Sequence, residues 1–269
     1  MVTRKKETIK KEVNVLNSFK KKTNTEKIII VTGATGFSGA KSKDDAMWTY
    51  SCPITAWKRV SESILIEERK LILKGERSSF ENLISQIKCD SIYKVLVTVD
   101  NGQFNLVKII DKSSDSEMDA FLAQQIAPIY LEDEELGEFV LERSVNWFEK
   151  TIDWLGTEVT ICFSNDEKNF HQIIQDIRSV MSEKVEWDTK VRVFVADDLL
   201  DYRNETCLQE GEEPLTHDDF QKRIVLNSIS FRHNGQIEFW FGDDDIFFGH
   251  LLTVNAQINS GCISVDING

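Results

Sequence analysis

The strongest alternation of apolar and polar residues in the chain lies in residues 137–163. Read with a period of two, one face carries Phe139, Leu141, Arg143, Val145 and Trp147, and the other is mostly polar. This is expected for an antiparallel strand with one buried side. Apolar alternation then leads up to Trp154 and resumes at Val159. Leu155-Gly156-Thr157 fits a tight turn between these runs, because glycine adopts positive φ without steric cost. We therefore expect one strand over 137–147, followed by a hairpin that turns at Gly156.

The rest of the C-terminal half predicts helices followed by strands. Residues 170–183 have apolar side chains at i, i+3, i+4 and i+7, and 187–208 predict a second helix, with 191–195 as an alternative strand. Residues 215–223 predict a short third helix capped by Thr216. Four more strands are expected, at 224–231, 236–241, 251–257 and 262–267. The pattern indicates an antiparallel sheet packed by two to three helices.

The N-terminal half predicts short strands with few helices. Asn101-Gly102 between two apolar runs is typical of a two-residue hairpin turn. Helices are expected over 78–88 and 113–126, the second ended by Pro128. The expected strands are 47–57, 64–66, 71–74, 92–99 and 104–110. This pattern favours a small β-barrel or sandwich, the barrel resembling an oligonucleotide-binding (OB) fold.

The whole chain is therefore expected to be an α+β protein. We predict four segments: a Lys-rich flexible tail (1–27), a β-rich domain (28–111), a helix with an acidic connector (112–136), and the C-terminal α+β domain (137–269).

One glycine-rich stretch, at residues 27–41, resembles the phosphate-binding turn of extended short-chain dehydrogenases. That chemistry requires a helix whose N-terminal amides bind the pyrophosphate. The following residues have no helical apolar face and soon reach Pro53, and none of the four tyrosines has a lysine four positions later. We therefore expect Gly33, Gly36 and Gly39 to form a loop between strands, and we expect no cofactor.

Charge is distributed unevenly along the chain. The net charge is −13, yet residues 1–27 carry nine Lys/Arg and three Asp/Glu, a net of +6, so the remainder carries −19. Such an acidic body repels nucleic-acid phosphates and suits a basic protein partner. The acidic segment 197–219 is by default a solvated helix face and loop, and in the functional interpretation it is the docking surface for such a partner. Its candidate partner-binding residues are Asp197, Asp198, Asp201, Tyr202, Glu205, Glu212 and Glu213.

Cysteine usage and hydropathy bear on the compartment. Five cysteines are scattered without CxxC spacing, which argues for reduced thiols and against a zinc site. No apolar run approaches the roughly 20 residues needed to span a bilayer, and the N-terminus has no hydrophobic signal region. A cytoplasmic protein without membrane association is expected.

Asp243, Asp245 and His250 are the best candidates for a metal site, because hard cations prefer several oxygen ligands. The calcium-loop pattern fails, with Phe248 at its sixth position and Val254 at its twelfth. An acidic turn between two strands is the simpler interpretation. The four histidines lack HExxH spacing and no GxSxG occurs, so we assign no catalytic residue.

Several segments in order resemble one bacterial family. They are ELGEFVLERSVNWFEKTIDWLG, LTHDDFQKRIVLNSISF, IEFWFGDDDIFFGH and SGCISVDING. The combination resembles proteins with domain of unknown function twenty-two sixty-two (DUF2262). ITAWK, FNLVKIID and APIYLEDEELG are similar to the β-rich N-terminal half of its longer members. The family has no established reaction, so the resemblance assigns no functional residues.

The expected function is that of a non-catalytic acidic protein-binding module, immunity-like in masking a basic partner. One alternative is a metal-dependent or hydrolytic enzyme that uses Asp243, Asp245 and His250. Another is nucleic-acid contact through the N-terminal barrel and the Lys-rich tail. Oligomeric state is not specified by the sequence.

Overall fold

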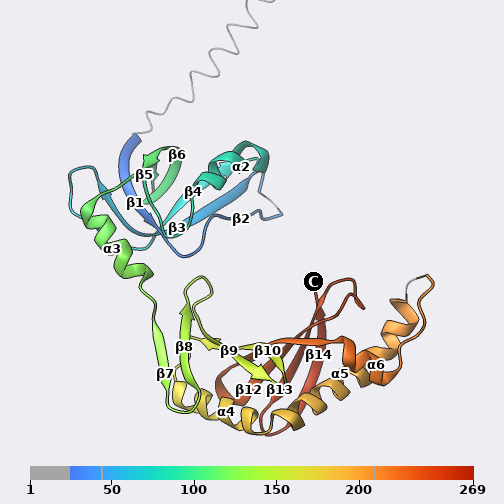
Figure 1. The fold of residues 1–269 in the computed structure, drawn as a ribbon. Coiled ribbons are helices and arrows are strands. Elements are labelled where there is room, and N and C mark those ends of the chain that lie inside the picture. Colours follow the sequence, from blue (N-terminus) through green and yellow to red (C-terminus); the bar gives the residue numbers. More distant parts are fainter. Residues whose placement is uncertain (1–24, 44, 209) are drawn as a thin grey trace, which may run out of the picture. The chain divides into compact units, whose positions relative to one another are not determined.

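The computed structural model describes residues 25–43, 45–208 and 210–269 (Figure 1). Most of the predicted Lys-rich tail therefore lies outside the described residues. The chain divides into two compact units, one ending at Ala127 and the other beginning at Pro128. Both mix strands with helices, so the protein is α+β.

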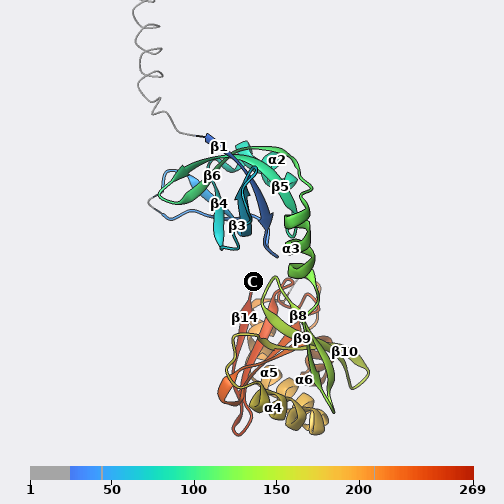
Figure 2. The same cartoon turned by 90° about the vertical axis from the view of Figure 1, so that its left-hand side faces the viewer.

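The N-terminal unit is a closed five-stranded barrel (Figure 2). Around it the strands follow the order β1-β5-β6-β4-β3, and β3 pairs back with β1. Neighbours are antiparallel except β4 and β6, and α2 (Arg77–Gln86) lies between β4 and β5 in sequence. This is the arrangement of an OB barrel, as predicted. The strands are β1 (Thr25–Thr32), β3 (Trp48–Arg59), β4 (Arg69–Gly75), β5 (Ile92–Asp100) and β6 (Gln103–Lys112), with β2 (Ser38–Ala40) beside β3.

Strand β1 explains why the glycine-rich stretch resembles a dinucleotide fold. Ile28 and Ile30 face the barrel core, whereas Ile29 and Val31 pack with Met118 of α3 (Ser116–Ile126). Burial on both faces gives the continuous apolar run that is also typical of parallel-sheet strands. No helix follows it: the chain passes into β2, where a Cβ on Gly39 would lie 2.6 Å from the Tyr50 ring.

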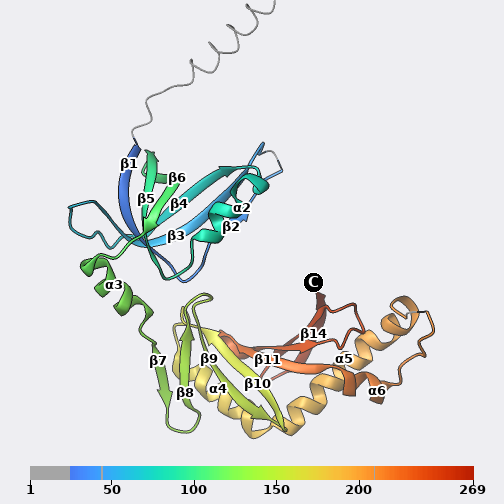
Figure 3. The same ribbon diagram turned by 45° about the horizontal axis from the view of Figure 1, so that its top comes forward.

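The C-terminal unit is an eight-stranded sheet in the order β14-β13-β12-β11-β10-β9-β8-β7. Among its described strands, the β10–β11 pairing alone is parallel. Between them the chain forms α4 (Phe170–Ser182), α5 (Lys184–Thr206) and α6 (His217–Arg223), and α4 and α5 lie along one face of the sheet (Figure 3). The strands are β7 (Tyr130–Asp133), β8 (Gly137–Glu142), β9 (Trp147–Trp154), β10 (Thr157–Ser164), β11 (Val225–Phe231), β12 (Gln236–Gly242), β13 (Leu251–Gln257) and β14 (Gly261–Asn268), with a 3-10 turn at His233–Gly235.

The core of this unit lies between the sheet and the two long helices. Trp187 of α5 stacks on Phe239 of β12 with ring centroids 5.7 Å apart. Phe139, Phe148 and Phe163 form a second aromatic group on β8, β9 and β10. These rings all lie in the core of the unit and are thus structural.

Several local predictions are confirmed and others are wrong. Two-residue turns occur at Asn101-Gly102 and at Leu155-Gly156, all four residues having positive φ. The single strand over 137–147 is wrong: β8 ends at Glu142, and Asn146 takes positive φ in the turn before β9. The alternation continues through that turn by coincidence.

Two further predictions are corrected. The alternative strand at 191–195 is wrong, because these residues belong to α5. The expected strand at 64–66 contributes a single bridge, between Leu65 and Trp57.

Lys58 connects the barrel to α3. Its Nζ lies 2.8 Å from Asp115 and 3.1 Å from Glu117, and the residue is 7% exposed. The hydrogen bond to Asp115, with a smaller one to Glu117, raises the pKa of Lys58, although burial opposes this. The same bond is the main cause that lowers the pKa of Asp115.

We predict that Lys58→Ala lowers the free energy of unfolding of this unit by about 1.5–3 kcal/mol, the range for hydrogen bonds to charged groups. Amide hydrogen exchange of α3 and β1 measures it. Lys108→Ala, which removes an exposed lysine of β6, is the control and should change the free energy of unfolding little.

The Lys58–Asp115 ion pair is lost as pH falls through the lowered pKa of Asp115 or rises through the raised pKa of Lys58. The difference between wild type and variant should therefore shrink at both extremes; a difference independent of pH would contradict this.

Candidate functional site

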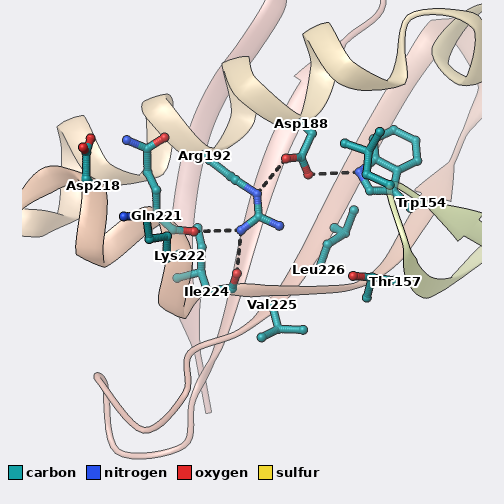
Figure 4. Close-up of a pocket in the computed structure, with 11 residues that line it drawn as sticks. Trp154, Thr157, Asp188, Arg192, Asp218, Gln221, Lys222, Ile224, Val225 and Leu226 are labelled. Atoms are coloured by element: carbon teal, nitrogen blue, oxygen red, sulfur yellow. Dashed lines mark hydrogen bonds and ion pairs between the residues drawn. The ribbon is translucent and has the colours of Figure 1, made fainter.

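A recess of about 490 Å³ lies between α5, α6 and the ends of β9, β10 and β11 (Figure 4). Arg192 of α5 projects into it. Its Nε donates to Asp188 Oδ2 over 2.8 Å, and its Nη1 donates to the carbonyl oxygens of Gln221 and Ile224 over 2.8 and 2.6 Å. Asp188 in turn accepts from Trp154 Nε1 over 3.0 Å. The guanidinium is thereby fixed on two sides.

The third nitrogen of Arg192, Nη2, points toward the open recess in Figure 4. In the part of the chain that the structure describes, it has no hydrogen-bond partner. Such a group can donate to a ligand oxygen. However, Arg192 and Lys222 are balanced by Asp188 and Asp218 among the lining residues, so the recess provides no net attraction for an anion. The geometry therefore describes a neutral polar recess.

Sequence reasoning did not single out Arg192 or Asp188. They are spaced i, i+4 on a helix, a pair that usually stands on a solvated face. The carbonyl partners of Arg192 come from α6 and from its C-cap residue, about thirty residues later. Nothing in the local pattern indicates that long-range contact.

The acidic candidates on α5 form one exposed stripe. Asp198, Asp201, Tyr202 and Glu205 follow i, i+3, i+4 and i+7 spacing and are all exposed. Tyr202 is 48% exposed and stacks on Phe247 with centroids 6.4 Å apart. Neighbouring Asp197 pairs with His217 Nε2 over 3.0 Å. The helix therefore presents carboxylates around a partly open aromatic ring.

The acidic loop after α5 is tied to the helix by buried polar contacts. Arg203, 1% exposed, donates to Glu212 Oε2 over 2.8 Å and to the carbonyl of Glu213 over 3.4 Å. Asn204 exchanges two hydrogen bonds with the backbone of Leu215. Glu212 and Glu213 are thus positioned by the helix end, and Glu212 is engaged in an ion pair.

The turn that bears the metal candidates lies beside this stripe, because Phe247 packs against both Tyr202 and Phe220. Asp243 is 4% exposed, and its carboxylate accepts from the amides of Asp245, Phe247 and Gly249 over 2.7–3.1 Å. Its oxygens therefore organise the turn.

The other metal candidates have different surroundings. Asp245 is exposed, and His250 Nδ1 contacts the carbonyl of Phe247. The described residues include no group of three His, Cys, Asp or Glu placed to hold a metal ion.

Phe248 is the most unusual side chain of this turn. It is 58% exposed and its φ is 62°, a left-handed conformation that a bulky residue adopts at a cost. The backbone on either side of it is held by hydrogen bonds that the amides of Phe247 and Gly249 donate to the Asp243 carboxylate. The turn thus presents an exposed aromatic ring on a backbone that is held in a left-handed conformation.

The buried thiols fit structural roles. Burial, with a smaller contribution from Cys89, raises the pKa of Cys52 to about 12. Burial also raises the pKa of Cys162, whose Sγ lies 3.2 Å from Ser230 Oγ. Neither is poised as a thiolate nucleophile.

Residues 133–267 match the model described as an uncharacterized protein conserved in bacteria (DUF2262). This protein belongs to the DUF2262 family. Residues 16–125 match a second model, a domain of unknown function (DUF7021), which covers the barrel. No curated protein and no solved structure matches the chain.

The DUF2262 match includes every partner-binding candidate and every metal candidate named above. Over the described residues, no helix combines the length and apolarity required to cross a membrane. The family places the chain among bacterial proteins and assigns no reaction to these residues.

We predict that Arg192→Met destabilises the C-terminal unit by about 1.5–3 kcal/mol, because two carbonyls and Asp188 lose a charged donor. Lys190→Met is the matched control on the same helix. It removes an exposed i, i+4 pair with Glu186, which should contribute less than about 0.5 kcal/mol. Urea unfolding followed by tryptophan fluorescence measures both; equal effects would show that the network around Arg192 contributes little.

We predict that Asp243→Ala lowers stability by about 1–3 kcal/mol, since three backbone amides lose their acceptor. Asp245→Ala should change stability by less than about 0.5 kcal/mol, as for an exposed residue. Thermal unfolding of both variants, with and without Ca²⁺, Mn²⁺ or Zn²⁺, tests this. A metal-dependent rise in Tm that both substitutions abolish would instead establish a metal site.

Proposed function

We propose that the protein is a non-catalytic binding module whose acidic C-terminal unit docks a basic protein partner. The observation that carries the proposal is the stripe of Asp198, Asp201 and Glu205 around Tyr202, next to the turn that presents Phe248. Aromatic anchors surrounded by polar groups are typical of energetically important interface positions.

Electrostatics favours a basic partner in particular. Arg203, the arginine of segment 197–219, is buried against Glu212 and therefore contributes little positive charge at the surface. The carboxylates of Asp198, Asp201 and Glu205 have no ion-pair partner among the described residues. Unbalanced surface charge steers a partner of opposite sign and accelerates association.

Preorganisation further supports a docking role. Arg203 and Asn204 fix the acidic loop, and Asp243 fixes the turn that bears Phe248. A surface that is already ordered loses less conformational entropy on binding. A concrete form of the proposal is a cytoplasmic, immunity-like protein that covers a basic toxin or nuclease. The five free cysteines, none in a disulfide, are compatible with a reducing compartment.

The test is capture from a bacterial host that encodes the protein, at about 0.15 M ionic strength, where only nearby surface charges interact strongly. The bait is the full chain, and the matched variant is the triple change Asp198→Asn, Asp201→Asn, Glu205→Gln. Glu132→Gln, Glu138→Gln, Glu158→Gln removes three exposed charges elsewhere on the same unit and is the control.

We predict that wild type and control retain the same basic protein, and that the triple variant associates about tenfold more slowly at low salt. Tyr202→Ala and Phe248→Ala should each raise the dissociation rate, with a loss of about 1–2 kcal/mol or more in binding. Recovery of no basic protein, or equal loss with both triple variants, would refute docking at this stripe.

A further inference from the structure

A second recess, of about 410 Å³, lies between the first turns of α4 and two turns of the sheet, at His233–Gly235 and at 258–259. Its walls are fixed. Asn169 caps α4 by accepting from the amide of Gln172, and the amide of Ile258 donates to the carbonyl of Gly235 over 2.9 Å. Apart from Asp176 and His233, its lining is uncharged.

Asp176 of α4 is the unusual group of this recess. It is 8% exposed, yet it is an ionisable side chain on the apolar face of the helix, between Ile173 and Ile177. Its Oδ1 accepts from Gln172 Nε2 over 2.9 Å. No lysine, arginine or histidine of the described residues forms an ion pair with it.

Asp176 lines the recess, and its second oxygen, Oδ2, is not engaged by any part of the protein that the structure describes. Oδ2 has no hydrogen-bond partner among the described residues, and it is not fully enclosed by other atoms. It therefore retains accessible surface, and Asp176 lines this recess. A nearly buried carboxylate with one hydrogen bond and no counter-charge is costly unless another group compensates for it.

We propose that this recess binds an organic cation, a guanidinium or primary ammonium group, through the carboxylate of Asp176. The polar side chains of Asn169, Gln172 and Asn259 around it offer further acceptors. The N-terminus of a helix favours anions, but that influence falls off within the first turn, and Asp176 is six positions beyond Phe170. His233 is 67% exposed and lies 3.6 Å from Glu167, which offsets its charge when protonated.

This inference does not depend on the acidic stripe, since the two sites share no residue. It also differs from the Arg192 recess, where the charges of the lining residues cancel. In this recess the negative charge of Asp176 has no positive counterpart when His233 is neutral. The recess therefore favours a positively charged ligand.

The test is a titration of the full chain with methylguanidinium at low ionic strength, followed by amide NMR. Methylurea has nearly the same shape without the charge, and tetramethylammonium has the charge without N–H donors. We expect methylguanidinium to shift the signals of Gln172, Asn234 and Asn259, and both analogues to have little effect.

Asp176→Asn should weaken methylguanidinium binding by about tenfold or more, because a charge-assisted hydrogen bond becomes a neutral one. Its Tm without ligand should be unchanged or higher, since the buried charge is gone; a purely structural aspartate would give a lower Tm. Glu158→Gln removes one exposed carboxylate of β10 and is the control, with binding expected to be unchanged.

The source of the cation is decided by comparing agmatine with a capped Gly-Arg-Gly peptide. Tighter binding of agmatine indicates a free amine ligand, and tighter binding of the peptide indicates a protein side chain; either supports the site. Shifts that are absent, that persist in Asp176→Asn, or that are lost equally in Glu158→Gln would overturn it and leave a polar recess that holds water.

Discussion

The parallel pairing of β10 with β11 is the constraint on which the surfaces of the C-terminal unit depend. Two adjacent parallel strands cannot be joined by a tight turn, so the chain must cross the sheet before it returns. It does so as α4, α5 and α6. The Asp176 recess, the Arg192 network and the acidic stripe all use residues of this crossover, whereas the antiparallel remainder of the sheet is joined by short connections.

The Arg192 recess differs from the acidic stripe and from the Asp176 recess mainly in its balance of charges. The Arg192 recess contains two positive and two negative side chains, and its arginine already donates to three acceptors. The stripe on α5 and the recess at Asp176 contain carboxylates without a cationic partner among the described residues. Because a buried or clustered charge without compensation is unfavourable, the latter two surfaces are the ones expected to acquire a ligand of opposite sign.

Much of the fold could be predicted from periodicity. The helical spacing of Ile173, Ile177 and Val180 identified α4, and the two-residue turns with Gly102 and Gly156 followed from local chemistry. The error at 143–146 arose because an apolar alternation can persist through a turn. The continuous apolar run of β1 is visible in the sequence, but the element that buries its outer face is not, since α3 packs there from some ninety residues later.

The candidate sites were only partly accessible from the sequence. The carboxylates of α5 can be read directly from the sequence. Their arrangement around Tyr202 follows only once the residues are placed on the faces of a helix, and the stacking of Tyr202 on Phe247 follows only from the tertiary fold. A signal for Asp176 did exist: it falls three residues after Ile173 and four before Val180, on the face that the apolar pattern assigns to the core. Arg203 similarly continues the series Val191, Val195, Leu199.

The two buried charged residues, Arg203 and Asp176, differ in how many contacts within the protein account for their burial. Arg203 has three acceptors, two of them on the loop that it secures, so its burial is explained by the protein itself even though its Nε lacks a partner among the described residues. Within the described ranges, Asp176 has one neutral donor, from its own helix, and no hydrogen bond or ion pair to another element. Since replacing an unneeded buried charge by an apolar residue commonly increases stability, a charge that connects nothing is better explained by a ligand than by the fold.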